Sequence, residues 1–247
     1  WPYLTTRLYI DQTGDLEILN QQIGYFKDCH VQRCQGQDPL WAEGEYRQKD
    51  TKGKEYTGTV LEHLILQHLT AFWEVGEHNH IRLRNADWND ALDMASHRGE
   101  SVAFSNAYAG NLIGLAELIE EQQHRGYEEF QFLQEMEILF TEDMALYEDP
   151  DGKQKLLEEY LGKCMHHVSG NSIRVDAGEL ADNLRKKGQW MQEHIRRTEW
   201  IEEDEEKGWF NGYYDDHGAA LEGIRGGRAH MMLTGQVFSL MNATATK

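Results

Sequence analysis

Apolar residues at helical spacing are the feature that most limits how this chain can fold. In residues 59–73, apolar side chains recur every three or four positions, which is the period of an amphipathic helix. The same spacing predicts helices over residues 101–121, 130–147, 153–167 and 177–201, and an apolar helix or strand over 231–241. Proline, which breaks helices, occurs only 3 times in 247 residues. We therefore expect an all-α fold built from helical hairpins.

The segments outside these helices are rich in glycine and charge. Residues 28–56 are expected to form a long loop, and residues 208–227 a loop or a hairpin. At the N-terminus a helix is expected over residues 1–14. Its larger apolar residues share one face: Trp1, Leu4, Leu8 and Tyr9. The chain has no initiator methionine and begins inside this helix, which indicates a piece of a longer protein.

The charge balance excludes two classes of partner. Lys and Arg number 24 and Asp and Glu 43, so the formal net charge is −19. Such a chain is poorly suited to bind nucleic acid through its phosphates or to dock on anionic lipid. No apolar run approaches the roughly 20 residues of a membrane span. Three cysteines cannot form a full disulfide set, although Cys29 and Cys34 could pair, so reduced thiols and a cytoplasmic location are expected.

Two polar clusters have an ordinary structural interpretation. Several histidines lack the cysteine or carboxylate spacing of a zinc site, so we expect surface positions and no metal: His63, His68, His78 and His80. A basic cluster between glycines could face an anion, but a solvated loop is the simpler interpretation. Its members are Arg225, Arg228 and His230.

The densest chemistry lies in the run Asp87-Trp88-Asn89-Asp90. Glycosyl transfer requires a carboxylic acid that is still protonated at neutral pH, and packing against an indole raises a carboxyl pKa by desolvation. The alternative is that Asp87 caps a helix starting near Trp88, with Asp90 at its third position. Spacing alone leaves both interpretations open.

Residues 85–92 resemble the acid-bearing motif of the inverting disaccharide phosphorylases, the cellobiose and chitobiose phosphorylase family (glycoside hydrolase family 94). The resemblance continues in the same order along nearly the whole chain, in residues 9–15, 59–64, 100–102, 209–216 and 233–238. The Asp-Trp-Asn-Asp core is specific in this context and would be weak alone.

The resemblance implies a catalytic (α/α)6 barrel over residues 1–247, incomplete at both ends. It implies phosphorolysis of a β-glucoside to α-glucose 1-phosphate, with Asp90, or else Asp87, as the acid. It implies oligosaccharide and inorganic phosphate as partners, no cofactor and no metal, and a homodimer. The residues expected to bind substrate are Trp88, Asn89, Trp209 and Tyr213.

Three alternatives remain open. The segments that hold the glycone and the phosphate in this family are expected before Trp1 and after Lys247, so the chain could be an inactive carbohydrate-binding piece. It could belong to a cyclic β-1,2-glucan synthase, which shares the family. A hydrolase would need a base about 6.5–9.5 Å from the acid, for which the sequence offers Asp215, Asp216 and Glu222.

Overall fold

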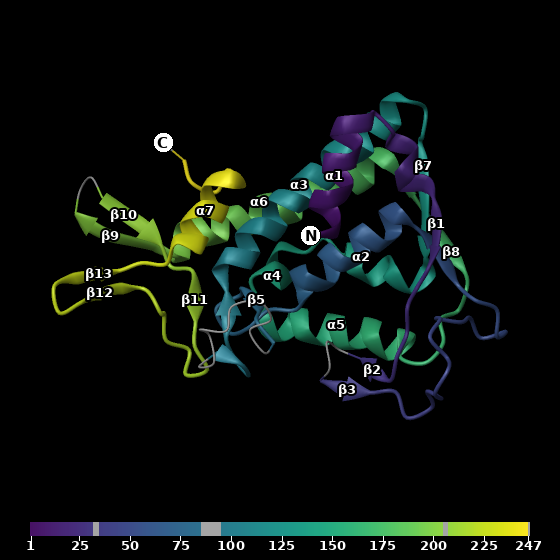
Figure 1. The fold of residues 1–247 in the computed structure, drawn as a ribbon, viewed down its shortest axis with the longest axis horizontal. Helices are drawn as coiled ribbons and strands as arrows, with labels where there is room; N and C mark the ends of the chain where they lie inside the picture. The colour runs from purple at the N-terminus through teal and green to yellow at the C-terminus, as the bar shows by residue number, and fades with distance from the viewer. Residues whose placement is uncertain (32–34, 85–94, 205–206, 247) are drawn as a thin grey trace.

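The computed structural model describes residues 1–31, 35–84, 95–204 and 207–246, and it combines helices with short strands (Figure 1). The residues in these ranges are 48% helical and 21% strand. The expectation of an all-α fold, and of a barrel made only of helical hairpins, is therefore wrong. The strands in the described ranges have two to five residues, too few to show a period of two against helical spacing in the sequence.

The α-helices in the described ranges are α1 (Pro2–Thr13), α2 (Val60–Trp73), α3 (Val102–His124), α4 (Met144–Tyr147), α5 (Pro150–Cys164), α6 (Ala177–Thr198) and α7 (Leu233–Met241). Two 3-10 helices are η1 (Leu16–Asn20) and η3 (Gln134–Phe140). The strands are β1 (Gln22–Gly24), β2 (His30–Val31), β3 (Gly36–Gln37), β4 (Thr57–Thr59), β5 (Ile81–Arg82), β6 (Glu100–Ser101), β7 (Glu129–Leu133), β8 (Ser172–Asp176), β9 (Trp200–Asp204), β10 (Lys207–Phe210), β11 (Tyr213–Tyr214), β12 (Gly223–Arg225) and β13 (Arg228–His230).

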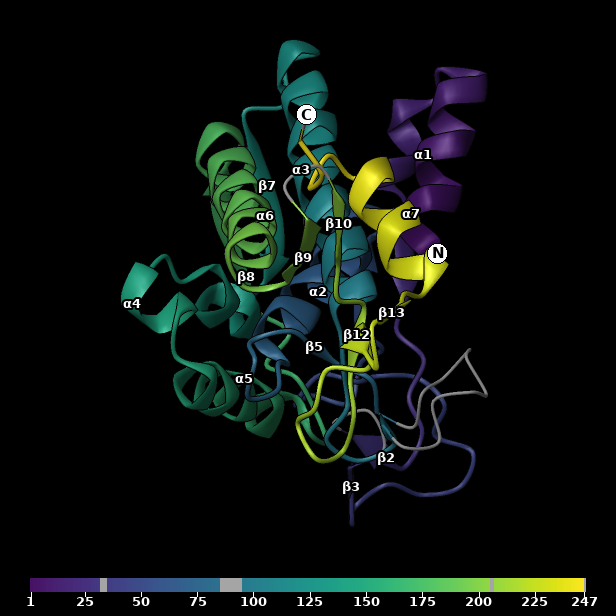
Figure 2. The same cartoon turned by 90° about the vertical axis from the view of Figure 1, so that its left-hand side faces the viewer.

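The helices predicted over residues 59–73, 101–121, 153–167 and 177–201 are confirmed as α2, α3, α5 and α6, and two of them carry the core. The long helices α3 and α6 pack against each other, and α2 lies against α3 (Figures 1 and 2). Gly188 of α6 makes this contact close, because a Cβ there would lie 2.7 Å from the carbonyl oxygen of Ala109. Thr59 and Ser101 cap the N-termini of α2 and α3 with their side chains, as expected for such residues.

Residues 130–147, expected as one helix, instead form β7, η3 and α4. β7 pairs with β8 in an antiparallel ladder, with Phe130 opposite Val175 and Phe132 opposite Ile173. The apolar residues of β7 alternate as in a strand. The helical spacing of the residues after them hides this short alternation in the sequence.

The helix at the N-terminus forms, but the expected apolar face is not the buried one. Tyr3 and Ile10 are buried, whereas Trp1 is 86% and Leu8 62% exposed. Both sides of α1 carry apolar residues, so its own sequence does not choose between them. The neighbouring helix decides which side is buried, because the ring of Tyr3 packs edge-on against that of His68 on α2.

Two lysines are fully buried among aromatic rings next to the core. The Nζ of Lys153 lies 4.0 Å from the ring centre of Trp190. The Nζ of Lys187 donates to Oδ1 of Asn183 at 2.7 Å and to the carbonyl oxygen of Thr141 at 2.9 Å. Burial disfavours the charged ammonium, so it lowers the pKa of Lys187 to about 7 and that of Lys153 well below its usual value.

Replacing Lys187 with methionine is expected to flatten the pH dependence of folding stability. The pKa of Lys187 is about 7 in the folded state against 10.5 for an ordinary lysine. Between these values the unfolded state binds the proton that the folded state lacks, so wild-type stability rises with pH. One such group contributes at most about 1.4 kcal/mol per pH unit. Urea unfolding above neutral pH should therefore show a smaller rise for Lys187→Met.

The control for this variant is Lys186→Met, because the exposed Lys186 lies beside Lys187 and pairs with Glu142 at the surface. It should keep the wild-type slope. Equal slopes for Lys187→Met and the wild type would contradict the prediction.

Candidate functional site

A small sheet brings together segments that are far apart in the sequence. Its strand order is β11–β6–β5, and all its pairs are antiparallel. Ser101 in the middle strand lies opposite both Tyr213 and Ile81. β5 precedes residues 85–94 and β6 follows them, so β11 joins the sheet of the two strands that bracket this segment and pairs with β6.

The residues on either side of the segment 85–94 pack against β11. Leu83 and Ala95, on either side of the segment, share one buried cluster with Tyr213. The backbone N–H of Leu83 donates to the carbonyl oxygen of Gly99 at 2.9 Å, which closes the base of the segment. The motif residues lie within 85–94 and so outside the described residues: Asp87, Trp88, Asn89 and Asp90.

Glu199, just after α6, is the centre of a buried hydrogen-bond network. Its carboxylate accepts bonds from Nε2 of His80 at 2.9 Å, from Nδ2 of Asn211 at 3.0 Å and from the hydroxyl of Tyr214 at 2.9 Å. Burial favours the protonated acid, but these donors outweigh it and hold the pKa of Glu199 at about 2. The ionised carboxylate thereby ties β11 to the turn before β5.

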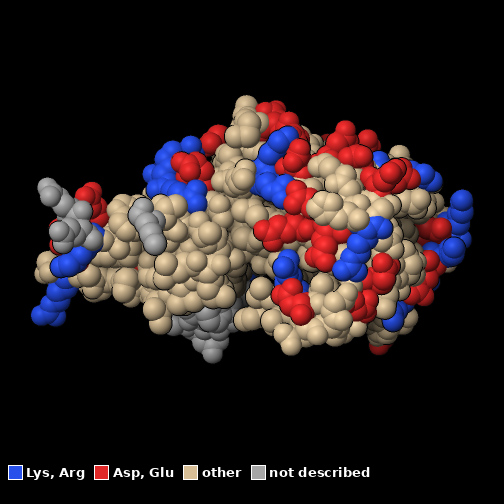
Figure 3. Space-filling model, turned by 90° about the horizontal axis from the view of Figure 1, so that it is seen from above, with Lys and Arg blue, Asp and Glu red and all other residues tan. Residues whose placement is uncertain are grey.

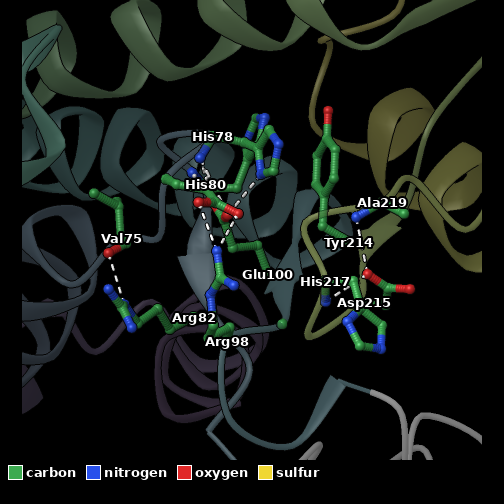
Figure 4. A network of polar contacts seen from close by, with 12 residues as sticks. Val75, His78, His80, Arg82, Arg98, Glu100, Tyr214, Asp215, His217 and Ala219 are labelled. Carbon is green, nitrogen blue, oxygen red and sulfur yellow. Dashed lines mark hydrogen bonds and ion pairs between the residues drawn. The ribbon is translucent and has the colours of Figure 1, made fainter.

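A second buried carboxylate, that of Glu100 in β6, holds the same turn (Figure 4). It accepts the backbone N–H groups of His78 and His80, and it bonds Nδ1 of His78 at 2.8 Å. The ring of His78 stacks on that of Tyr214 with ring centres 3.7 Å apart. Sequence reasoning missed Glu100 and Glu199 as organising residues, because no motif distinguishes a buried glutamate from an exposed one.

Two of the three carboxylates that a hydrolase could use as its base are engaged in turns. Oδ1 of Asp216 accepts the backbone N–H groups of residues 97–99 at 2.6 to 3.0 Å. Oδ1 of Asp215 accepts those of His217 and Ala219, each at 2.8 Å. Both carboxylates therefore organise the loops around β11, as Figure 4 shows for Asp215.

The third carboxylate, that of Glu222, is buried and has no side-chain hydrogen-bond partner in the described part of the chain. Burial raises its pKa to about 7, although the backbone N–H groups of Met232 and Gly212 act in the opposite direction. Glu222 lies so close to Gly212 that a Cβ on this glycine would be 2.5 Å from its Oε1. A group that titrates near neutral pH can serve as an acid or a base.

Glu222→Gln is expected to stabilise the folded protein above neutral pH. The folded state keeps the Glu222 proton up to about pH 7, whereas an ordinary glutamate loses it near 4.5. The free energy of unfolding of the wild type therefore falls as pH rises between these values. Because the amide of Glu222→Gln cannot ionise, the fall should be smaller in this variant by about 2–3 kcal/mol. Urea unfolding of both proteins at pH 5 and pH 8 measures this difference in the free energy of unfolding.

Glu203→Gln serves as the control, since Glu203 is exposed on β9. It should follow the wild type at both pH values. A Glu222→Gln protein that loses as much stability as the wild type over this range would show that Glu222 ionises normally.

The structure separates the two predicted substrate-binding aromatics outside the motif. Tyr213 is completely buried at the base of the segment 85–94. Trp209 is 5% exposed and borders an open cavity of about 570 Å³ between β10 and α7. Its indole N–H has no hydrogen-bond acceptor among the residues that the structure describes.

The histidines expected at the surface include two that are buried, His68 and His80. Nδ1 of His68 bonds the carbonyl oxygen of Leu64 at 2.6 Å, and its Nε2 lies 3.1 Å from Nδ2 of Asn111. These rings pack in the core because each finds polar partners there. Within the described ranges, no three His, Cys, Asp or Glu side chains are grouped so as to hold a metal ion.

None of the protein-family models matches this sequence, and the comparison with curated proteins also gives no match. None of the helices in the described part of the chain has the length and apolarity needed to cross a membrane. Cys29 and Cys164 carry free thiols, and Cys34 lies outside the described residues.

Proposed function

We propose that this chain carries the acid-bearing part of an inverting β-glucoside phosphorylase. The observation that supports this most is the sheet β11–β6–β5, in which Tyr213 packs with Leu83 and Ala95 on either side of the segment 85–94. Residues 85–92 and 209–216 are two of the segments that resemble the phosphorylase family. Two segments that build one site must lie together in the fold, and the described residues on either side of 85–94 pack beside β11.

In this proposal, Asp90, or Asp87 in its place, gives its proton to the glycosidic oxygen. An oxygen of inorganic phosphate attacks the anomeric carbon from the opposite face as the bond to the leaving sugar breaks. The products are α-glucose 1-phosphate and a sugar whose hydroxyl holds the donated proton. Phosphate is already a nucleophile, so no catalytic base is needed, unlike in an inverting hydrolase.

The buried network is well suited to support such a site. Catalysis requires the reacting groups to be held in place by side chains that are themselves fixed. Glu199 and Glu100 fix β11 and the turn before β5 with short hydrogen bonds. Substrate contacts are assigned in this proposal to Trp88, Asn89 and Trp209, whereas the buried Tyr213 supports the residues on either side of the segment 85–94.

A hydrolase is the second candidate, and the environment of Glu222 favours it. With a pKa of about 7, Glu222 can accept a proton from water, whereas Asp215 and Asp216 are held in turns. The two functions differ in whether sugar release requires phosphate.

The test is phosphate release from α-glucose 1-phosphate by the purified protein with glucose, N-acetylglucosamine or laminaribiose as acceptor. Sugar release from cellobiose is measured in parallel with and without phosphate. The phosphorylase predicts turnover that depends on phosphate. Phosphate-independent sugar release that Glu222→Gln abolishes would establish the hydrolase. Binding of sugars without turnover would indicate an inactive carbohydrate-binding chain.

A further inference from the structure

Two lysine side chains from different helices end in one buried aromatic cluster. Lys153 on α5 and Lys187 on α6 are both fully buried. The Nζ of Lys153 lies 4.3 Å from the ring centre of Phe72 and 4.0 Å from that of Trp190. The Nζ of Lys187 lies 5.4 Å from the ring centre of Tyr147. Figure 3 shows the usual arrangement on another part of the molecule, where Lys and Arg are exposed and interspersed with Asp and Glu.

The hydrogen bonds of both amines suit the neutral form. An ammonium group has three N–H donors, whereas a neutral amine has two. Lys187 has two acceptors among the described residues, the carbonyl oxygen of Thr141 and Oδ1 of Asn183. Lys153 has one, Oδ1 of Asn79 at 2.8 Å. Protonation of either amine in place would therefore bury a charge and a donor without an acceptor, and aromatic rings compensate only in part for the lost water.

The charged groups around the two amines do not neutralise them. The nearby carboxylates, Glu142 and Glu148, are partly exposed and already paired, with Lys186 at 2.7 Å and with Arg197 at 3.0 Å. The other titratable group that α6 places near the cluster is His194. Neither buried amine forms an ion pair with a carboxylate of the described ranges. Burial lowers the pKa of both lysines, in agreement with their contacts.

Lys153 also holds the turn before β5 (residues 76–80). Its amine bonds Oδ1 of Asn79, and Nδ2 of Asn79 donates to a backbone carbonyl oxygen of α4 at 2.9 Å. Asn79 has a φ of 66°, a left-handed conformation that asparagine adopts more readily than most residues. On either side of it, His78 and His80 donate their backbone N–H groups to the buried carboxylate of β6 (Figure 4). The anchoring of Asn79 by α4 and α5 therefore fixes the turn that this carboxylate binds.

Of the two helices that carry the lysines, α5 is the one with room to move. α6 is fixed at this level, because Gly188, next to Lys187, makes the close contact with α3. α5 lies at the outside of the helical layer, with α2 between it and α3 (Figures 1 and 2). An outward shift of α5 would bring water to both amines and would remove the lysine that anchors Asn79.

We propose that α5 is a proton-sensitive clamp on the turn before β5, closed while both amines are neutral and opened when Lys153 and Lys187 take up protons. In the open state water solvates the ammonium groups, and the turn loosens because Asn79 has lost its anchor. Each proton comes from water and binds the lone pair of one amine, so no other reactant is needed. For each amine that is neutral when closed and ordinary when open, opening becomes about tenfold more favourable per pH unit of acidification. This inference does not depend on the proposed function.

Hydrogen exchange followed by mass spectrometry at pH 7, 8 and 9 tests the clamp, with each rate divided by the intrinsic rate at that pH. Protection of the peptides of α5 and of the turn before β5 should fall at least about tenfold per pH unit from pH 9 towards pH 7. The slowest amides of α3 report global unfolding and should stay better protected than these peptides at each pH. Ordinary histidines and carboxylates titrate at about pH 6.5 and below, so they contribute little in this range.

The variant that removes both titrating amines is Lys153→Met with Lys187→Met. Protection of α5 and of the turn should then be independent of pH over the same range, because methionine carries no proton. Lys155→Met is the matched control, since Lys155 is exposed on the same helix, and it should keep the wild-type pH dependence.

Three results would overturn the proposal. Wild-type protection of α5 that does not change with pH excludes the clamp, and this measurement needs no variant to fold. Exchange of α5 and of the turn only together with α3 shows that they open by global unfolding alone. A double variant that keeps the wild-type pH dependence assigns the effect to groups other than the two lysines.

Discussion

Asp90→Asn is expected to lower phosphorolysis of a β-glucoside with a sugar leaving group by about 10²–10⁴-fold, the usual contribution of a general acid. The leaving sugar is a poor leaving group as an alkoxide, so the reaction depends on a proton delivered to the glycosidic oxygen. An amide of the same shape cannot deliver it. The measurement is kcat for sugar release in the presence of phosphate.

A substrate with an activated aryl leaving group distinguishes lost acid catalysis from a damaged site. Such a group departs without protonation, so Asp90→Asn should lose far less activity on it. Asp93→Asn in the same segment is the control and should remain near the wild type. If Asp90→Asn keeps wild-type turnover on the sugar substrate, the acid is Asp87 or the resemblance to the phosphorylases does not extend to activity.

Glu199→Ala is expected to cost about 3–5 kcal/mol of folding stability, as the loss of one partner from a buried ionic network does. The substitution leaves His80, Asn211 and the hydroxyl of Tyr214 without their shared acceptor. Desolvated donors without an acceptor are costly, and β11 loses its link to the turn before β5. Urea unfolding at neutral pH measures the loss.

The control is Glu193→Ala on the exposed side of α6, whose carboxylate pairs with Arg196 at 3.3 Å. Surface pairs of this kind contribute about 0–1 kcal/mol, so stability should barely change. Activity of Glu199→Ala, assayed well below its unfolding temperature, should also fall, because β11 packs against the residues on either side of the segment 85–94. A loss of less than about 1 kcal/mol would show that the network is not strongly coupled to folding.

The helices of this chain could be predicted because their signal is local. Thr59 caps α2, Ser101 caps α3 and the apolar residues that follow repeat at helical spacing. The strands could not be predicted equally well. β5, β6 and β11 have two residues each, and their existence depends on partners distant in the sequence.

Part of the candidate site could be recognised from the sequence, and part of it only from the structure. Its acid motif is visible in the sequence, since Asp87, Trp88, Asn89 and Asp90 are adjacent and chemically distinctive. Glu100 and Glu199 are not visible, because a carboxylate is recognised as organising only when its donors surround it. Asp215 and Asp216 look equally suited to act as a base, and only their backbone hydrogen bonds show that they stabilise turns.

The sequence by itself determined the main helices, the net charge of −19 and the place of the Asp-Trp-Asn-Asp run, because each depends on neighbouring residues or on composition. The tertiary structure decided which side of α1 is buried, that residues 129–133 form a strand, and that β11 pairs with β6, the strand that follows residues 85–94. It also decided that α7 presents Leu233 and Leu240 to the outside. These outcomes depend on contacts between distant segments, and their free energies are not encoded in any local pattern.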